Sequence, residues 1–363
     1  MSPTKRATAK PGKKATAKAR KASSKAVRKS SKKAAGRVAK KAAKKSTKSV
    51  KAVAKKASKK AAARAVKAVA KAVKGAARAI KSSVAKAPPR PPSPNTVFIE
   101  NITAPMPFLR KGVPAEMFAA LRRKVIREAG FDFLSAFGDM MRGRGFTTTK
   151  QGASNRSRHK CGDAFDYNQA DRRFVLVKEP RGGRMYWRTY LLCAKQDGSQ
   201  GESLRIQNEQ LLAPVQGSAP RYYYDFTSAA EALGWQRIRA QVGYQTVYNK
   251  KEFWHYQNIE GYSFDEALEL LYGNSGNVRP RPRFPTVRPG DRDNDNEVNV
   301  LRDVRQVQAQ LYLLKLLAPL KEVDGGFGSK TETALKTFQQ REGLPVTGIA
   351  DEATRRLLLE RVL

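Results

Sequence analysis

The sequence SRHKCGDAFD, residues 157–166, and the shorter sequence EFWH, residues 252–255, decide how the central part of this chain can be interpreted. They hold the only two histidines of the chain, His159 and His255, and the carboxylates of Asp166 and Glu252 lie within a few residues of them. Two imidazoles and one carboxylate suit a catalytic zinc site, which keeps a fourth position open for water. A separate carboxylate is then needed to take the proton of that water. From residue chemistry alone, the alternative that both histidines are structural stays open.

The spacing Ser-x-His-x-x-Gly-x-Ala-x-Asp, followed by Glu-x-Trp-His, resembles the M15 family of zinc peptidases. This family includes D-alanyl-D-alanine carboxypeptidases, dipeptidases and phage L-alanyl-D-glutamate endopeptidases. The resemblance covers roughly residues 97–273 and implies a small α+β body whose antiparallel sheet carries the metal. It also implies that His159, Asp166 and His255 bind Zn²⁺ and that Glu252 is the catalytic base.

Two features depart from the family pattern. The family usually has an arginine that steadies the substrate; here Arg142 is the candidate, with Arg144 as the alternative. Asp166 and Glu252 are 86 residues apart, a longer separation than we expect for the family. The additional residues between the two motifs include the tyrosines at 222–224. These could line a substrate cleft, but we expect them to be sheet and core residues. Cys161 follows a proposed ligand by two residues and is expected to be a small buried side chain.

Apolar periodicity and turn residues predict the elements of residues 96–273. Helices are expected at 115–129, ending at Gly130, at 228–241 and at 264–272. Strands are expected at 131–137, 174–177 and 184–194. A proline-rich linker is expected at 274–299. Its run DRDNDN superficially matches a calcium loop, but Asn296 and Arg302 stand where that loop needs Gly and Glu, so we reject a calcium site.

The sequence VDGGFGSKT, residues 323–331, dominates the C-terminal unit, residues 300–363. Apolar residues at helical spacing follow it, and the unit is predicted to consist of a helix, a Gly-rich turn, a second helix and a short third helix. The pattern Asp-Gly-x-Phe-Gly-x-x-Thr resembles the peptidoglycan-binding domain type 1, a three-helix bundle. The resemblance implies peptidoglycan as a partner.

Residues 1–95 are strongly basic, with 32 Lys and Arg and no acidic residue. The net charge of the whole chain is +41, so the remaining residues carry only +9. A Lys/Ala-rich tail without aromatic residues is expected to be disordered and to bind polyanions, such as DNA or anionic envelope polymers. Apolar residues at helical spacing between Val66 and Val84 suggest a helix that forms on an anionic surface. The proline-rich spacer 87–95 follows.

Sequence composition excludes several classes of protein. No run of about 20 apolar residues could span a bilayer, no signal peptide is visible, and two cysteines cannot make a disulfide framework. We therefore expect a zinc-dependent peptidoglycan peptidase, made in the cytoplasm and acting at the bacterial cell wall, of the phage lysin or virion-associated type. The alternatives are a nucleic-acid-condensing protein with a secondary or inactive peptidase body and a wall-anchoring protein without catalysis.

Overall fold

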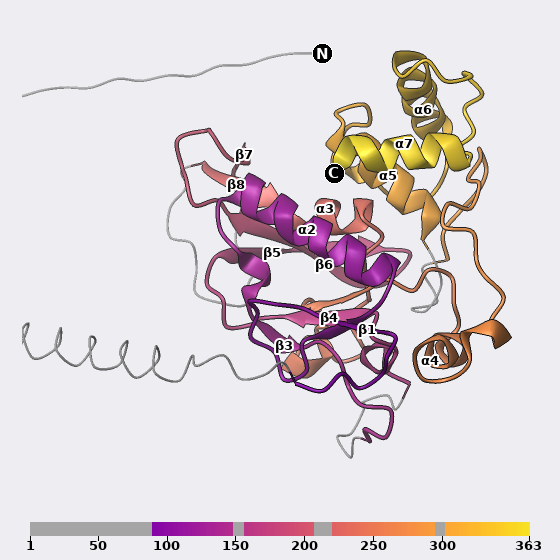
Figure 1. The fold of residues 1–363 in the computed structure, drawn as a ribbon. Coiled ribbons are helices and arrows are strands. Elements are labelled where there is room, and N and C mark those ends of the chain that lie inside the picture. Colours follow the sequence, from indigo (N-terminus) through magenta and orange to yellow (C-terminus); the bar gives the residue numbers. More distant parts are fainter. Residues whose placement is uncertain (1–88, 148–155, 207–219, 295–301) are drawn as a thin grey trace, which may run out of the picture. The chain divides into compact units, whose positions relative to one another are not determined.

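The computed structural model describes residues 89–147, 156–206, 220–294 and 302–363, and these belong to one compact unit. The prediction of a disordered tail, and that of a helix between Val66 and Val84, lie outside the described residues. Within the described part, helices and antiparallel strands are mixed, as an α+β fold requires (Figure 1).

The strands form three antiparallel groups. A hairpin joins β1 and β2, one four-stranded sheet has the order β3-β4-β10-β9, and a second has the order β5-β6-β8-β7. The bounds are β1 Thr96–Phe98, β2 Phe108–Arg110, β3 Phe137–Asp139, β4 Ala164–Tyr167, β5 Phe174–Arg181, β6 Arg184–Leu192, β7 Glu202–Leu204, β8 Arg221–Asp225, β9 Gln236–Arg237 and β10 His255–Gln257.

Six α-helices and several 3-10 turns complete the described part of the chain. The α-helices are α2 Val113–Ala129, α3 Phe226–Ala232, α4 Phe264–Tyr272, α5 Asp303–Leu313, α6 Ser329–Arg341 and α7 Glu352–Val362. The 3-10 turns are η1 Phe133–Ser135, η2 Arg158–Cys161, η3 Tyr248–Lys250, η4 Ser275–Asn277 and η5 Leu320–Glu322.

Aromatic packing joins α2 to the sheet that contains β4 and β10. The ring of Phe118 on α2 contacts those of Phe137, Phe165 and Trp235 at centroid distances of 5.6 to 6.3 Å. Phe118, Phe165 and Trp235 are completely buried. Because this core packs against Phe165 on β4, the backbone of the neighbouring residue Asp166 is held in place.

Several predicted elements are confirmed. The helix at 115–129 is α2, and it ends at Gly130, whose φ of 82° is left-handed and so favours glycine. The helix at 264–272 is α4, and the strands at 174–177 and 184–194 lie within or largely coincide with β5 and β6. The tyrosines at 222–224 belong to β8, as expected for sheet residues.

Two predicted elements are wrong. The aromatic run 131–137 is not a strand, because Phe133 turns into the core within η1 and only Phe137 begins a strand, β3. The helix predicted at 228–241 stops at Ala232. Gly234, with a φ of 80°, turns the chain so that Trp235 enters the core and the next two residues form β9.

The C-terminal module consists of α5, α6 and α7, and two buried glutamines give it an internal repeat. The side-chain oxygen of Gln308 accepts a hydrogen bond from Gly325 N at 2.7 Å, and its amide nitrogen donates to Gly326 O in the turn after α5 and to the Thr331 hydroxyl at the start of α6. Gln339 repeats this arrangement after α6, where it accepts from Gly348 N at 2.9 Å. The two loops of the module are therefore built on the same buried amide.

Part of the predicted linker is bound along this module. The backbone of Val287 pairs with Ala350, and Asp293 N donates to Gly325 O at 2.8 Å. The Asp293 carboxylate accepts hydrogen bonds from the backbone N–H groups of Val304 and Arg305. A side chain from the linker thus satisfies the otherwise unpaired first turn of α5.

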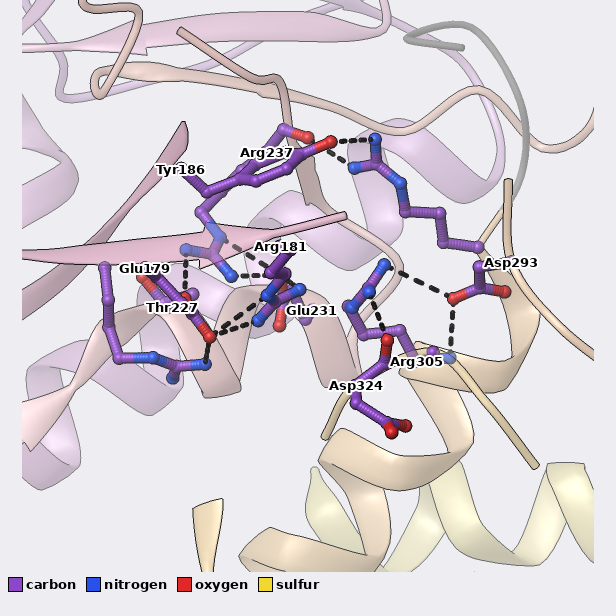
Figure 2. Close-up of polar contacts among 12 residues, drawn as sticks. Glu179, Arg181, Tyr186, Thr227, Glu231, Arg237, Asp293, Arg305 and Asp324 are labelled. Carbon is purple, nitrogen blue, oxygen red and sulfur yellow. Dashed lines mark hydrogen bonds and ion pairs between the residues drawn. The ribbon is translucent and has the colours of Figure 1, made fainter. Parts of the chain in front are cut away.

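The module also packs against the body through α3 and α5. Figure 2 shows the buried charged side chains at this junction. On the body side, Arg237 binds Glu231 and Glu179, each at 2.8 Å. Arg302, which precedes α5, donates to Arg237 O at 2.6 Å and to Tyr186 Oη at 3.1 Å. The body and the module are therefore joined by hydrogen bonds between buried groups.

Candidate metal centre

The three predicted ligands come from two strands and one 3-10 turn. Strands β4 and β10 are antiparallel neighbours, and their register places His255 directly opposite Asp166. His159 lies in η2, which ends at Gly162, with a φ of 65°. A Cβ at Gly162 would lie 2.9 Å from Arg110 N, so the glycine of the motif is needed for this turn to approach β2.

The turn is held in place by a buried ion pair. Arg158 donates to both oxygens of Asp163, at 3.1 and 2.5 Å, and both side chains are almost fully buried. Arg158 also donates to Tyr262 O at 3.2 Å. Arg158, directly before His159, and Asp163, three residues before Asp166, therefore anchor the backbone of the motif.

The side-chain atoms of the three residues converge. His159 Nε2 lies 3.1 Å from Asp166 Oδ1, and His255 Nδ1 lies 2.9 Å from the same oxygen. One ligand atom from each residue lies within 4.8 Å of the others, and all three side chains are buried.

The outer nitrogens of the two imidazoles define their protonation. His159 Nδ1 lies 2.9 Å from Met140 O, a carbonyl that can only accept, so this nitrogen carries a proton. His255 Nε2 lies 3.3 Å from Gln257 Oε1 and can donate to it in the tautomer that carries a proton on this nitrogen. Neutral rings would then turn bare nitrogens towards the Asp166 carboxylate. Such an arrangement needs a cation, either protons on the rings or a metal ion.

A zinc ion fits this donor set. Tetrahedral zinc with bonds of about 2.0–2.1 Å keeps its ligand atoms about 3.4 Å apart, and the two histidine nitrogens here lie 3.1 and 2.9 Å from Asp166 Oδ1. Zinc-binding histidines usually donate their other N–H to a carbonyl or carboxylate, as His159 and His255 do. His159, Asp166 and His255 could therefore hold Zn²⁺ and leave one position open.

The pKa values in the cluster follow from this proximity. Burial alone would lower the pKa of His159, but the Asp166 carboxylate outweighs it and the pKa is raised. Burial alone would raise the pKa of Asp166, but the two imidazoles hold it well below its ordinary value. The carboxylate is therefore ionised, which is the form that binds a metal.

Glu252 lies beside this cluster. Burial raises the pKa of its carboxyl above the ordinary value, opposed by the nearby His255. Its backbone has a φ of 55°, an uncommon conformation for a residue other than glycine. The Glu252 carbonyl accepts a hydrogen bond from His255 N at 3.3 Å, so the turn that carries the glutamate is continuous with β10.

Of the two candidate arginines, Arg142 is the one near the cluster. Its backbone N donates to His159 O at 3.1 Å, and its guanidinium binds Asp139 at 2.5 Å and Ser157 Oγ at 3.1 Å. The guanidinium of Arg144 instead lies 6.0 Å from the ring centre of Tyr272 at the end of α4. Cys161 is completely buried, as expected, and burial raises the pKa of its thiol.

Two glutamines at the site were not predicted from the sequence. Gln257 lies two residues after His255, so strand alternation places both side chains on the same face of β10, and this spacing could have revealed it. Gln241 Nε2 donates to Glu252 Oε1 at 2.6 Å. No sequence pattern joins these two residues, because the contact depends on how the loop between them closes.

Comparison with known proteins identifies the C-terminal module. The family model described as "Putative peptidoglycan binding domain" matches residues 301–358. The structure titled "The crystal structure of SleB N-terminal domain" is 29% identical, covers 22% of this chain and 96% of that chain, and has a TM-score of 0.19. No curated protein is similar enough to this chain to count as a match. The family match confirms the predicted resemblance of this module to a peptidoglycan-binding domain.

The described helices include none with the length and apolar character needed to cross a bilayer.

Proposed function

We propose that this chain is a zinc peptidase that hydrolyses peptide bonds in the stem peptides of peptidoglycan. The observation that carries the proposal is the convergence of His159, Asp166 and His255 on a point that needs a cation. The M15-like motif supports a peptidase, and the peptidoglycan-binding domain at residues 301–358 supports the choice of substrate.

The metal ligands and Glu252 have separate roles in the proposed hydrolysis. Bound at these three side chains, zinc would supply a Lewis acid for the scissile carbonyl and lower the pKa of water. Glu252 takes a proton from the water that attacks the carbonyl carbon. It delivers this proton to the nitrogen of the leaving amine as the C–O bond forms and the C–N bond breaks. Burial favours this role, because it raises the pKa of the carboxyl above its ordinary value and so makes it a better proton acceptor.

Arg142 is the candidate for holding the substrate oxygen. Its guanidinium is oriented by Asp139 and Ser157. A guanidinium presents several N–H donors in a planar fork, which suits a carbonyl oxygen that gains negative charge or a substrate carboxylate. Two reaction types fit these residues, a D,D-carboxypeptidase and an L-alanyl-D-glutamate endopeptidase, and we place the enzyme among phage-type lysins or virion-associated enzymes.

A second function is proposed for residues 1–95. Their 32 positive charges, with no acidic residue among them, favour binding to DNA or to anionic envelope polymers by counterion release. A chain that only condensed nucleic acid, or only anchored itself to the wall, would bind its polymer without releasing peptides. Turnover on purified sacculi therefore separates these functions.

The test is digestion of purified sacculi by the zinc-loaded chain, with the released fragments identified by mass spectrometry. Fragments that differ by one hydrolysed peptide bond are expected, and they also identify which bond is cut. Glu252→Ala should keep about one zinc per chain and lose at least ~10²-fold in turnover. Alanine at the exposed Glu100 is the control and should change neither. Binding to sacculi without any released peptide would contradict the proposal.

A further inference from the structure

The segment from Gln241 to Lys250 is a closed loop next to the candidate metal centre. Gln241 N donates to Lys250 O at 2.8 Å, which joins the two ends of the loop. Tyr248 stacks on Trp254, with ring centres 5.5 Å apart, and so fixes the loop against the residue before His255. The two ends of this loop, at Gln241 and Lys250, therefore have a defined position relative to β10.

From the first residue of this loop, the Gln241 side chain extends to Glu252. Its Nε2 donates to Glu252 Oε1 at 2.6 Å. Among the described residues, this amide is the single hydrogen-bond partner of the Glu252 carboxylate. Glu252 also sits at a left-handed backbone position, so its side chain starts from an unusual direction and depends on this contact for its orientation.

We propose that Gln241 is a positioning residue for catalysis, which holds Glu252 Oε1 so that Oε2 faces the water and the leaving amine. This inference rests on the proposed peptidase function. An amide suits the task, because it donates a hydrogen bond without carrying a charge and does not itself accept or release the proton. The contact removes rotational freedom from a side chain that must meet the substrate in one orientation.

The test compares two leucine substitutions in the same loop. Gln241→Leu removes the donor and nearly preserves the volume, whereas Gln245→Leu changes an exposed glutamine of the loop and is the matched control. On a soluble stem peptide, Gln241→Leu should lower kcat about 10- to 100-fold, the range known for residues that orient a metal site. KM should stay within about twofold, the zinc content should be unchanged, and Gln245→Leu should match the wild type.

A double-mutant cycle distinguishes positioning from a general effect on the loop. If Gln241 acts only through Glu252, then adding Gln241→Leu to Glu252→Ala should lower the residual kcat by less than about twofold, because the group that it orients is gone. If the two losses multiply, Gln241 acts on something else and the inference is wrong. Gln241→Asn, which keeps an uncharged amide donor on a shorter side chain, should retain more activity than Gln241→Leu, and activity no higher than that of Gln241→Leu would also contradict the inference.

The outcomes separate this inference from the proposed function. A wild-type chain that loads zinc but does not hydrolyse stem peptides overturns both. Hydrolysis that depends on Glu252 but is unchanged in Gln241→Leu overturns only the role of Gln241. Thermal unfolding of Gln241→Leu is measured in parallel, and should the variant unfold early, the comparison is made with Gln241→Asn and the double-mutant cycle at a temperature where all variants are folded.

Discussion

Asp293, the linker residue that caps α5, offers a prediction with a defined sign and size. Its carboxylate accepts hydrogen bonds from Val304 N and Arg305 N, at 3.1 and 3.0 Å, and lies 3.5 Å from Arg305 Nη1 (Figure 2). Burial raises its pKa from the ordinary 3.8 to about 6, because the cost of desolvation exceeds the effect of the nearby Arg305. The folded protein therefore binds a proton here at pH values where the unfolded chain has released it.

The sign of the pH dependence follows from this difference. A pKa that is raised on folding stabilises the fold fully below the unfolded pKa of 3.8, and this stabilisation is lost as the pH rises through about 6. Moving the pKa by this amount corresponds to about 3 kcal/mol. Asp293→Asn cannot titrate. The free energy of unfolding of the wild type, minus that of Asp293→Asn, should therefore fall by about 2 kcal/mol between pH 4 and pH 7.5, because part of the change already occurs below pH 4.

The assay is urea unfolding of both proteins at a series of pH values, with the difference taken at each pH. Subtraction removes the contributions of all other titrating groups, because they are common to the two proteins. If the difference rises with pH over this range, the ion pair with Arg305 outweighs burial and the reasoning is refuted.

Three further predictions concern the metal, the module and the tail. His159→Ala or His255→Ala should abolish zinc retention and activity together, measured by metal analysis and turnover, and full zinc in either variant would show that the ligand assignment is wrong. Gln339→Leu should lower the free energy of unfolding by about 2–4 kcal/mol, because it leaves several buried polar groups unpaired, whereas Gln340→Leu at the exposed neighbouring position should change it by less than about 0.5 kcal/mol. An isolated fragment of residues 1–95 should bind duplex DNA of any sequence, with log affinity falling linearly in log salt concentration; a preference for one sequence, or binding that is insensitive to salt, would contradict counterion release.

Local sequence patterns predicted much of the fold correctly. Helix α2 was predicted because its apolar residues recur at helical spacing and Gly130 ends it in a left-handed conformation. The three helices of the C-terminal module follow from its family signature. The strand predicted at 131–137 failed because apolar content alone does not distinguish a strand from a buried turn: Phe133 packs against rings from β4, β5 and α3.

The candidate site, too, could be predicted from the sequence only in part. His159 and Asp166 are close in sequence, and His255 belongs to a recognisable motif, so all three could be named from the sequence. The Met140 carbonyl and Gln241 could not, because their contacts depend on the path of the chain between distant elements. Sequence patterns therefore indicated the candidate ligands, whereas the groups that orient them become visible only in three dimensions.

The bound linker and the buried junction between α3 and α5 change what the peptidoglycan-binding domain can do for the rest of the chain. A domain on a flexible tether lets an enzyme search every bond within the reach of the tether, and its benefit falls as the tether lengthens. Here hydrogen bonds from Arg302 and Asp293 hold the module against its neighbours, so in the proposed peptidase, binding of the polymer and presentation of a bond to the candidate metal centre would be coupled in one geometry. Such coupling would restrict the choice of bonds on an insoluble wall, and the spacing of cuts along the polymer would then depend on the fold rather than on diffusion.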